Sequence, residues 1–594
     1  MSNRSRSLIL AATVTATALA ACHVTSVTPT PNASNATTSD AAPTLAPRRA
    51  ATFPAGWRLP AGQHATFGAH AMIASNSQLA SDAGREILQR GGNAVDAAVA
   101  VGFALAVAYP AAGNIGGGGF MLIRLADGRT AAMDYREMAP HAATHDMYLD
   151  AQGNPQSTST EGPLASGVPG SVAGMAAALA KYGTMSLAQV MAPAIRLAEQ
   201  GYVIDSGAWR GLRGDSAKLA RYASASPFFV SGHLVAPGTR LVQPDLARTL
   251  HRIAERGPSE FYTGATADSL VAEMQRDRGI ITKADLAGYQ ALWRDPLKTT
   301  YRGFTVLGMP PVSSGGTTSF EILNQLETFD TLPSFGSAAY AHLIAETERR
   351  AFIDRNAKLC DPAFCTVPVA QLTSKAYARQ LASTIDLAHA SPTPLAPVMP
   401  SSMHTTHYSV VDAHGNAVST TTTLNLGFGS GVWVRGAGFF MNDEMDDLAA
   451  APGKPNAFGL VQGEQNAVQP GKRPLSSMTP TIVLDSAQRV LLVVGAAGGP
   501  TIISGTTEVL LNVIDHRMSL ADAMRAPRLH HQALPDSLAF ERGGLTTSAM
   551  DSLRAMGHGL SPRGSLVNVN AILRVKGGWE GQHEPRSAGG EAGY

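Results

Sequence analysis

The spacing of apolar positions along the chain changes near residue 405. Residues 166–294 carry mostly the helical period, most clearly in 171–181, 187–200 and 244–256. Beyond Thr405 the pattern becomes that of short strands separated by turns. Strands are expected at 408–411, 417–424, 481–484 and 490–494, and residues 495–499 then lead into a helix at 501–516. The pattern predicts a sheet with helices packed on it that begins at Thr405.

A continuous apolar segment and a glycine-rich run stand in the first part of the chain. Residues 94–108 are mostly Ala, Val, Leu and Phe behind a capping Asn93, which predicts a buried helix. The run 113–120 contains five glycines, but it lacks the Lys-Ser/Thr of a phosphate-binding loop and leads into a strand. It therefore favours close backbone packing over nucleotide binding.

Composition excludes one class of partner. The chain has 594 residues, of which 15% are charged, with 46 basic and 45 acidic side chains. It has no long basic run, so nucleic-acid binding is not expected. The length allows several domains or one large unit with a sizeable core.

The first residues have the pattern of an export signal. Arg4 and Arg6 precede an apolar run at 8–21 that is too short to span a membrane. The run ends at Cys22 and resembles a bacterial lipoprotein signal, in which the cysteine takes a lipid; ordinary cleavage at a small-residue site is the alternative. Residues 22–51 read as a disordered linker rich in Pro, Thr, Ser and Ala. We expect an exported protein, either periplasmic or lipid-anchored to the membrane.

Two further cysteines, Cys360 and Cys365, lie close together in the sequence. An exported protein meets an oxidising compartment, which favours a local disulfide. A metal site is the competing interpretation, but no second Cys or His pair has ligand spacing. We expect neither a metal nor another cofactor.

Thr405 is the candidate nucleophile. A threonine hydroxyl is weakly nucleophilic and needs a base. If Thr405 were the first residue of a chain, its own α-amine, with a reference pKa of about 7.7–8.0, could take the proton. This chemistry requires that the preceding peptide bond be cut first.

An ordered set of motifs resembles the γ-glutamyltranspeptidases, which are N-terminal-nucleophile hydrolases. Before Thr405 the motifs are at 91–98, 114–120, 135–140 and 310–316; after it they are at 405–412, 442–447, 473–478 and 498–499. The resemblance implies an α+β fold, a four-layer αββα sandwich built from two subunits. It also implies self-cleavage between His404 and Thr405, which gives a large subunit, 52–404, and a small catalytic subunit, 405–594.

The resemblance assigns roles to individual residues. Thr405 matches the nucleophile and Thr423 a threonine that hydrogen-bonds it. A γ-glutamyl group carries an α-carboxylate, which suits a guanidinium and hydroxyl donors, and an α-ammonium, which suits carboxylate and amide oxygens. Arg136, Ser476 and Ser477 match the carboxylate site, and Asn425, Glu444 and Asp447 match the ammonium site. Gly498 and Gly499, ahead of the 501–516 helix, match the oxyanion loop.

The reaction implied is transfer of a γ-glutamyl group, as from glutathione, to Thr405 and then to water, an amino acid or a dipeptide. Residues 452–460 resemble a lid, but Phe458 stands where relatives have Tyr, so a hydroxyl hydrogen bond is lost. The nearest alternative is a related acylase, such as a cephalosporin or glutaryl acylase, or a poly-γ-glutamate processing enzyme. A serine hydrolase is disfavoured because the chain has no Gly-x-Ser-x-Gly motif. An anchored binding protein would not need Thr405, Thr423 and the Gly-Gly loop together.

Overall fold

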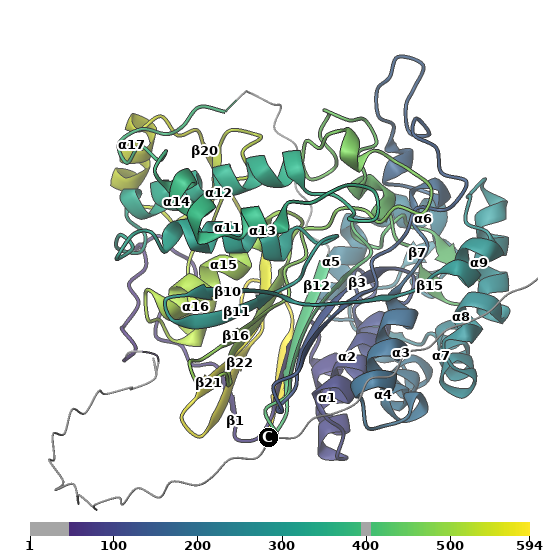
Figure 1. Cartoon of the computed structure of the whole chain (residues 1–594). Coiled ribbons are helices and arrows are strands. Elements are labelled where there is room, and N and C mark those ends of the chain that lie inside the picture. Colours follow the sequence, from purple (N-terminus) through teal and green to yellow (C-terminus); the bar gives the residue numbers. More distant parts are fainter. Residues whose placement is uncertain (1–44, 46, 394–404) are drawn as a thin grey trace, which may run out of the picture. The chain divides into compact units, whose positions relative to one another are not determined.

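Two seven-stranded antiparallel sheets lie face to face between two layers of helices (Figure 1). The computed structural model describes residues 45, 47–393 and 405–594. The predicted signal segment 1–21, Cys22, most of the linker 22–51 and His404 lie outside these residues. The described chain belongs to one unit, Ala42–Tyr594.

The first sheet contains Thr405 in one of its central strands. Its order is β23 (Gly590–Gly593), β2 (Met72–Ser75), β12 (Thr405–Val411), β13 (Ala417–Thr423), β3 (Gly118–Arg124), β4 (Thr130–Asp134) and β9 (Leu292–Arg294). Strands β12 and β13 form the hairpin that the sequence predicts, with Thr405 opposite Thr423. Strand β12 begins at Thr405 rather than at Tyr408, because its ladder to β13 extends to that residue.

The second sheet covers the inner face of the first. Its order is β1 (Thr66–Gly68), β22 (Gly578–Gln582), β21 (Asn568–Val575), β17 (Val490–Ala497), β16 (Thr481–Leu484), β11 (Phe304–Gly308) and β10 (Leu297–Tyr301). The expected link at 495–499 is partly wrong, because β17 continues to Ala497 along β21. Position 495 of this strand requires a glycine, because the His407 ring packs against it. A Cβ at this position would stand 2.4 Å from the Cε1 atom of His407.

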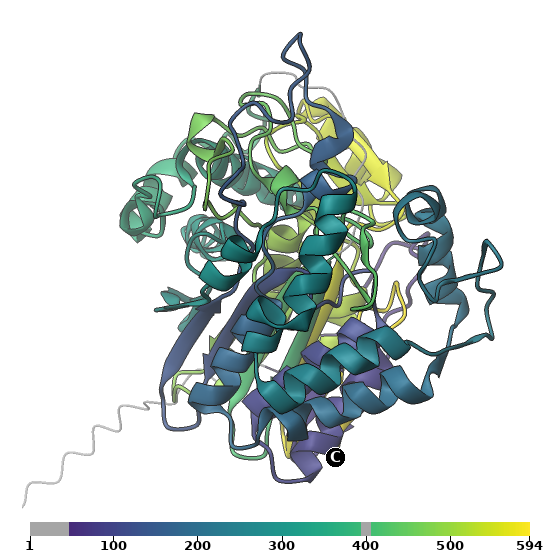
Figure 2. The same ribbon diagram turned by 90° about the vertical axis from the view of Figure 1, so that its right-hand side faces the viewer.

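Helices cover the outer face of each sheet. The first sheet is covered by α1 (Gln78–Gln89), α2 (Ala94–Ala108) and α3 (Ser171–Tyr182); α4 (Leu187–Gln200) packs on α1 and α2, and α7 (Pro244–Arg256) packs on α4. Figure 2 shows these helices from their own side. The second sheet is covered by α11 (Gly315–Leu326), α15 (Thr501–Ile514) and α16 (Leu520–Arg525), and α12 (Ala338–Lys358) packs against α11.

Shorter elements lie around these four layers. The helices are α5 (Ser206–Gly214), α6 (Ser216–Tyr222), α8 (Ser259–Thr263), α9 (Ala265–Arg276), α10 (Lys283–Gly288), α13 (Val369–Leu372), α14 (Lys375–Ala382) and α17 (Thr547–Ala555). The strands are β5 (Tyr202–Val203), β6 (Phe229–Val230), β7 (His233–Leu234), β8 (Arg240–Leu241), β14 (Trp433–Val434), β15 (Phe439–Phe440), β18 (Leu529–His530), β19 (Leu538–Glu541) and β20 (Leu560–Arg563). Four 3₁₀ turns complete the set: η1 (Ser157–Ser159), η2 (Pro163–Ala165), η3 (Glu444–Asp447) and η4 (Glu464–Asn466).

The alternation along β3 shows how the layers are joined. Met121 and Ile123 belong to the core between the first sheet and its helices. Phe120 and Leu122 point the other way, into the core that the second sheet shares. Successive side chains of a strand face opposite sides, so a strand with apolar residues on both faces is stable only between two covering layers. The four-layer αββα sandwich expected from the sequence is confirmed.

Helix α2 forms where its sequence predicts. The Asn93 side chain accepts from the Val95 and Asp96 backbone N–H groups, and the Asp96 carboxylate accepts from the Asn93 N–H, which completes a capping box. The helix is buried along nearly its whole length. None of the helices in the described residues is both long and apolar enough to cross a membrane.

Candidate active site

A pocket at the head of β12 gathers most of the residues singled out in the sequence. It is lined by Arg136, Thr405, Thr423, Asn425, Glu444, Asp447, Phe458, Leu460, Ser476, Ser477, Met478, Gly499, Pro500 and Ile502. Gly498 precedes Gly499 at the pocket wall. Arg136 comes from the part of the chain before Thr405 and the other residues from the part after it.

Thr405 and Thr423 face each other across the β12–β13 hairpin. Their Oγ1 atoms are 3.3 Å apart, and Thr423 Oγ1 also accepts from the Asn425 backbone N–H at 2.8 Å. Asn425 has a left-handed backbone, with φ of 81°, which turns the chain away from β13 directly after the threonines. Its Nδ2 donates to the Asp443 carbonyl at 3.1 Å. The Asn425 amide oxygen is then the remaining polar atom of that side chain.

The glycine-rich run at 113–120 supports this hairpin. Asn114 Nδ2 donates to the Thr423 carbonyl at 2.8 Å, and Asn114 Oδ1 accepts from the Gly117 N–H at 2.9 Å. A Cβ on Gly117 would stand 2.1 Å from the Thr423 carbonyl oxygen. The run therefore packs backbone against backbone, as its sequence predicts, and Asn114 is a supporting residue that only the fold reveals.

Arg136 lies buried among carboxylates. Its Nη1 pairs with Glu444, its Nη2 donates to Asp447 Oδ2 at 2.6 Å, and its Nε donates to the Pro474 carbonyl at 3.0 Å. Burial alone would lower the pKa of Arg136, but Glu444, Asp447 and Glu137 hold it above its ordinary value. Burial also raises the pKa values of Glu444 and Asp447, against the opposing effect of Arg136. Arg136, expected to bind a carboxylate, thus pairs with Glu444 and Asp447, expected to bind an ammonium.

Ser476 and Ser477 present hydroxyl groups whose oxygens already accept hydrogen bonds. Ser476 Oγ accepts from the Met478 N–H at 3.1 Å, and Ser477 Oγ accepts from Arg355 Nη2 at 3.1 Å. A serine hydroxyl has one proton to donate. Both protons are therefore directed to an acceptor other than these partners, which suits a bound carboxylate.

The glycine turn and Phe458 close the pocket on the other side. Gly498 and Gly499 have φ of 148° and 62°, and they lead through Pro500 into the first turn of α15. The Phe458 ring packs on Gly499, where a Cβ would stand 2.5 Å from Phe458 Cδ1. Thr405 is only 6% exposed. The free space in the pocket is about 20 Å³, which holds about one water molecule, so a larger ligand requires the surrounding side chains to rearrange.

The loop that carries Phe458 is fastened to the acidic turn below it. Asn456 Nδ2 donates to Asp447 Oδ1 at 3.3 Å, and the Ala457 N–H donates to Asp446 Oδ2 at 3.0 Å. Burial raises the pKa of Asp446 to about 6. The cover is therefore bonded to η3, the turn that also carries Glu444 and Asp447 of the expected ammonium site.

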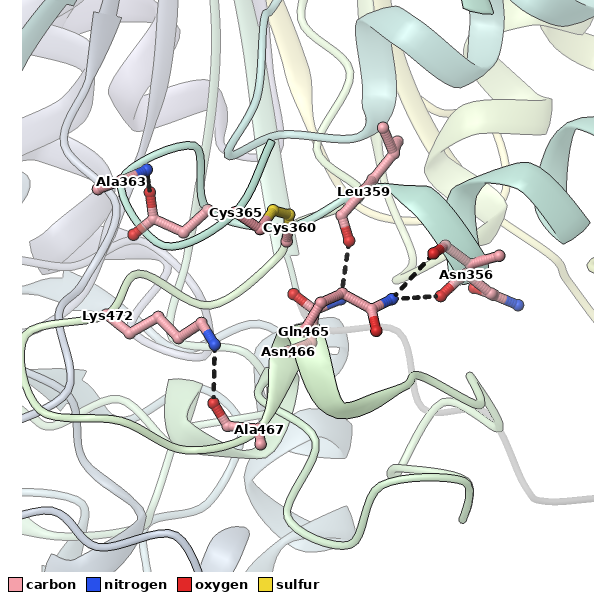
Figure 3. Close-up of a disulfide and its surroundings, with 11 residues drawn as sticks. Asn356, Leu359, Cys360, Ala363, Cys365, Gln465, Asn466, Ala467 and Lys472 are labelled. Carbon is pink, nitrogen blue, oxygen red and sulfur yellow. Dashed lines mark hydrogen bonds between the residues drawn. A yellow bond between two sulfur atoms is a disulfide. The ribbon is translucent and has the colours of Figure 1, made fainter. Parts of the chain in front are cut away.

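Cys360 and Cys365 lie away from the pocket and form a disulfide, with Cα atoms 6.3 Å apart (Figure 3). The loop they close contacts a segment that leads toward Ser476. Asn466 Nδ2 donates to the Leu359 carbonyl at 2.8 Å, and the Arg473 N–H donates to Asp361 Oδ2 at 2.9 Å.

A separate group of residues has metal-ligand spacing. In the described part of the chain, ligand atoms of His342, Glu346 and His558 lie within 4.8 Å of one another. Glu346 already pairs with Arg349 and Arg350. Two guanidinium groups on the only carboxylate of the trio oppose binding of a cation there.

The layered fold with a threonine at the head of a central strand defines an N-terminal-nucleophile hydrolase. A profile of the family described as Gamma-glutamyltranspeptidase matches residues 80–594, and the chain belongs to this family. It is 47% identical over 518 residues to the glutathione hydrolase proenzyme of Escherichia coli, covering 85% of this chain and 89% of that protein.

Two solved structures show the same fold. A cephalosporin acylase from Bacillus halodurans matches with a TM-score of 0.80 and 28% identity, over 91% of this chain and 99% of that one. A γ-glutamyltranspeptidase from Helicobacter pylori matches with a TM-score of 0.53 and 45% identity, over 56% of this chain and 95% of that one.

Proposed function

We propose that the protein transfers and hydrolyses γ-glutamyl groups, with glutathione and other γ-glutamyl amides as donors. The observation that carries the proposal is the position of Thr405 Oγ1, 3.3 Å from Thr423 Oγ1, in a pocket lined by Arg136, Glu444 and Asp447. An α-amino acid end has both signs of charge, and this pocket offers groups of both signs. The relatives named glutathione hydrolase support the same substrate.

The protein is proposed to cut itself between His404 and Thr405, giving a large subunit, 52–404, and a small one, 405–594. The relative from Escherichia coli is named a proenzyme, which supports processing. The cut frees the α-amine of Thr405, which then serves as the base for its own hydroxyl.

The reaction proceeds in two steps. The Thr405 amine takes the hydroxyl proton while Oγ1 attacks the γ-carbonyl carbon, and the N–H groups at Gly498 and Gly499 stabilise the oxyanion. The amide C–N bond breaks, the leaving nitrogen takes that proton, and a γ-glutamyl ester of Thr405 remains. Water or an acceptor amine then attacks the ester, which restores the hydroxyl. Thr423 hydrogen-bonds Thr405 and so orients its hydroxyl.

Binding of the donor is proposed as an exchange of ion pairs. The α-carboxylate takes donors from Arg136, Ser476 and Ser477, and the α-ammonium takes acceptors from Asn425, Glu444 and Asp447. The ammonium releases the two carboxylates from Arg136 as the substrate carboxylate replaces them. A donor that lacks either charge leaves one group of the pocket buried without a partner, which is costly.

The likeness to a cephalosporin acylase makes that activity the second candidate. Assays on γ-glutamyl anilide and on glutaryl anilide, which lacks the amine, separate the two. We expect a kcat/KM at least about tenfold higher for γ-glutamyl anilide, because at least one charge-assisted hydrogen bond is lost with the amine. Equal or faster turnover of glutaryl anilide would favour the acylase.

Replacement of the nucleophile tests the catalytic assignment. Thr405→Ala should remain uncut and show no turnover of γ-glutamyl anilide. Thr405→Ser, the matched control, keeps a hydroxyl and should still be processed and active. Turnover by an intact Thr405→Ala protein would exclude Thr405 as the nucleophile.

We also propose that the protein is exported and held at the cell envelope through Cys22. Arg4, Arg6 and the apolar run that ends at Cys22 support this location. Cys22→Ser should abolish metabolic labelling with a fatty acid, and labelling that persists in this variant would contradict the anchor.

A further inference from the structure

Arg355, near the end of α12, is a buried cation beside the pocket. It is 1% exposed, and in the described part of the chain its hydrogen-bond partners are neutral side chains. Its Nε donates to Ser314 Oγ at 3.2 Å, its Nη1 to Asn356 Oδ1 at 2.9 Å and its Nη2 to Ser477 Oγ at 3.1 Å. A buried guanidinium usually has a carboxylate partner, because an unpaired buried charge is costly. Its placement therefore calls for an explanation.

We propose that Arg355 is a positioning residue that directs the hydroxyl of Ser477 toward the α-carboxylate of a γ-glutamyl donor and supplies positive charge behind it. The proposal rests on the proposed function. Arg355 does not line the pocket and acts through Ser477, which does. Because Arg355 fills an acceptor position on Ser477 Oγ, the serine proton is left for the ligand.

The same guanidinium also holds the neighbouring serine. Ser314 accepts from Arg355 Nε, and its own Oγ donates to the Ser476 carbonyl at 2.6 Å. The Ser314 N–H donates to the same carbonyl at 2.7 Å. One arginine thus fixes Ser477 directly and the backbone of Ser476 through Ser314. This also gives the 310–316 motif a function, since it supplies Ser314.

The charges in the pocket explain why a second arginine is useful. Arg136 pairs with Glu444 and Asp447, so the carboxylate of a donor competes with two carboxylates for it. Arg355 has no such competitor in contact with it in the described residues. Burial lowers the pKa of Arg355 to about 10, against the opposing effect of the Asp447 carboxylate, which acts on it without forming an ion pair, so Arg355 remains charged at neutral pH.

The end of α12 is held in place from outside the pocket. Gln465 Nε2 donates to the Asn356 carbonyl at 3.0 Å, and Asn466 Nδ2 donates to the Leu359 carbonyl (Figure 3). The loop closed by Cys360 and Cys365 follows directly. A rigid support of this kind is what a positioning residue requires, because its hydrogen bonds depend on geometry.

Two donors that differ only in the α-carboxylate test the proposal: γ-glutamyl anilide and 4-aminobutyryl anilide. For Arg355→Gln we expect KM for γ-glutamyl anilide to rise about tenfold, the loss of about one charge-assisted hydrogen bond, with kcat changed less than about twofold. On 4-aminobutyryl anilide, kcat/KM should change less than about twofold. Arg355→Lys should behave like Arg355→Gln, because an ammonium lacks the planar fork that reaches Ser314 and Ser477 together.

A double variant shows whether Arg355 acts through Ser477. Arg355→Gln with Ser477→Ala should raise KM by clearly less than the product of the two single effects, because only the support of Ser476 and the positive charge remain to be lost once Ser477 is removed, whereas independent effects would multiply. Arg350→Gln, on the same helix but bonded to Glu346, is the control and should leave both donors unaffected. Equal losses on both donors in both Arg355 variants, or multiplying effects, would overturn the proposal. A wild-type enzyme without preference for the α-carboxylate would instead contradict the proposed function itself.

Discussion

Thr405 owes its environment to residues that are distant in sequence. Its hydroxyl faces Thr423, its strand is supported by Asn114 through the Thr423 carbonyl, and the glycine turn at Gly498–Gly499 lies across the pocket. Because Thr405 is the first residue of β12, its own backbone nitrogen lies beside its hydroxyl at the head of the strand. That is the geometry in which a freed α-amine can serve as a base.

His407, two residues further along β12, gives a pH-dependent contribution to stability. Burial lowers its pKa from the ordinary 6.5 to about 3. As the pH falls through 6.5, the unfolded chain binds a proton at this residue and the folded chain does not. The free energy of unfolding should therefore fall by up to about 1.4 kcal/mol per pH unit from this group between pH 6.5 and 3.

Urea unfolding at about pH 7 and about pH 5 measures this contribution. His407→Gln should lose about 1–2 kcal/mol less stability between these conditions than the wild type does. Comparing pH dependences removes any constant cost of the substitution. Identical pH dependence in both proteins would show that His407 does not titrate in this way.

Single residues differ in how far the sequence could reveal them. Arg136, Asp447 and Ser477 were assigned through the motifs around them, and all three line one pocket. The ion pairs of Arg136 with Glu444 and Asp447 could not be predicted, because they join positions about three hundred residues apart. No motif or apolar spacing marks Arg355 in the sequence, and only the packing of α12 shows that it is buried.

At the scale of elements, we propose that the cover that carries Phe458 controls access to the pocket. Phe458→Ala removes the ring that packs on Gly499 and opens Thr405 to solvent. We expect KM for γ-glutamyl anilide to rise several-fold and the hydrolysed share of product to increase, because water reaches the ester more easily. Initial rates with and without glycylglycine measure both effects.

Phe458→Tyr is the matched control for this prediction, since it retains the ring and adds a hydroxyl. Its KM should stay within about twofold of the wild type. A Phe458→Ala enzyme with unchanged KM and unchanged product ratio would show that the ring does not control access.

The sequence predicts the helices in which the apolar residues are either continuous or regularly spaced. Helix α2 is apolar throughout, and α4 and α7 begin and end where their patterns do. The spacing of apolar residues does not predict helix α12, because polar residues such as Glu346, Arg349 and Arg355 are buried in it. Their partners lie in distant segments, so no local spacing of apolar residues reveals the buried face.

At the scale of the whole molecule, the parts before and after Thr405 share both sheets. Strand β12 pairs with β2, and β13 pairs with β3. In the second sheet, β16 pairs with β11 and β22 pairs with β1. Cutting one peptide bond leaves these ladders and the two cores between the layers intact.

The two proposed subunits should therefore stay together after processing. We expect them to elute as one species in gel filtration at neutral pH and to separate only under denaturing conditions. The part from Thr405 onward should not remain folded alone, because β12 and β13 would lose their outer partners. Elution of two separate folded species would contradict this interleaved arrangement.

The most direct test of the account is the intact mass of the purified protein. The account predicts two polypeptides whose masses place the boundary between His404 and Thr405, and a single uncut polypeptide for Thr405→Ala. During turnover of γ-glutamyl anilide, the smaller polypeptide should also gain the mass of one γ-glutamyl group. A single uncut mass in a preparation with full activity would contradict the central claim that Thr405 becomes the nucleophile through self-cleavage.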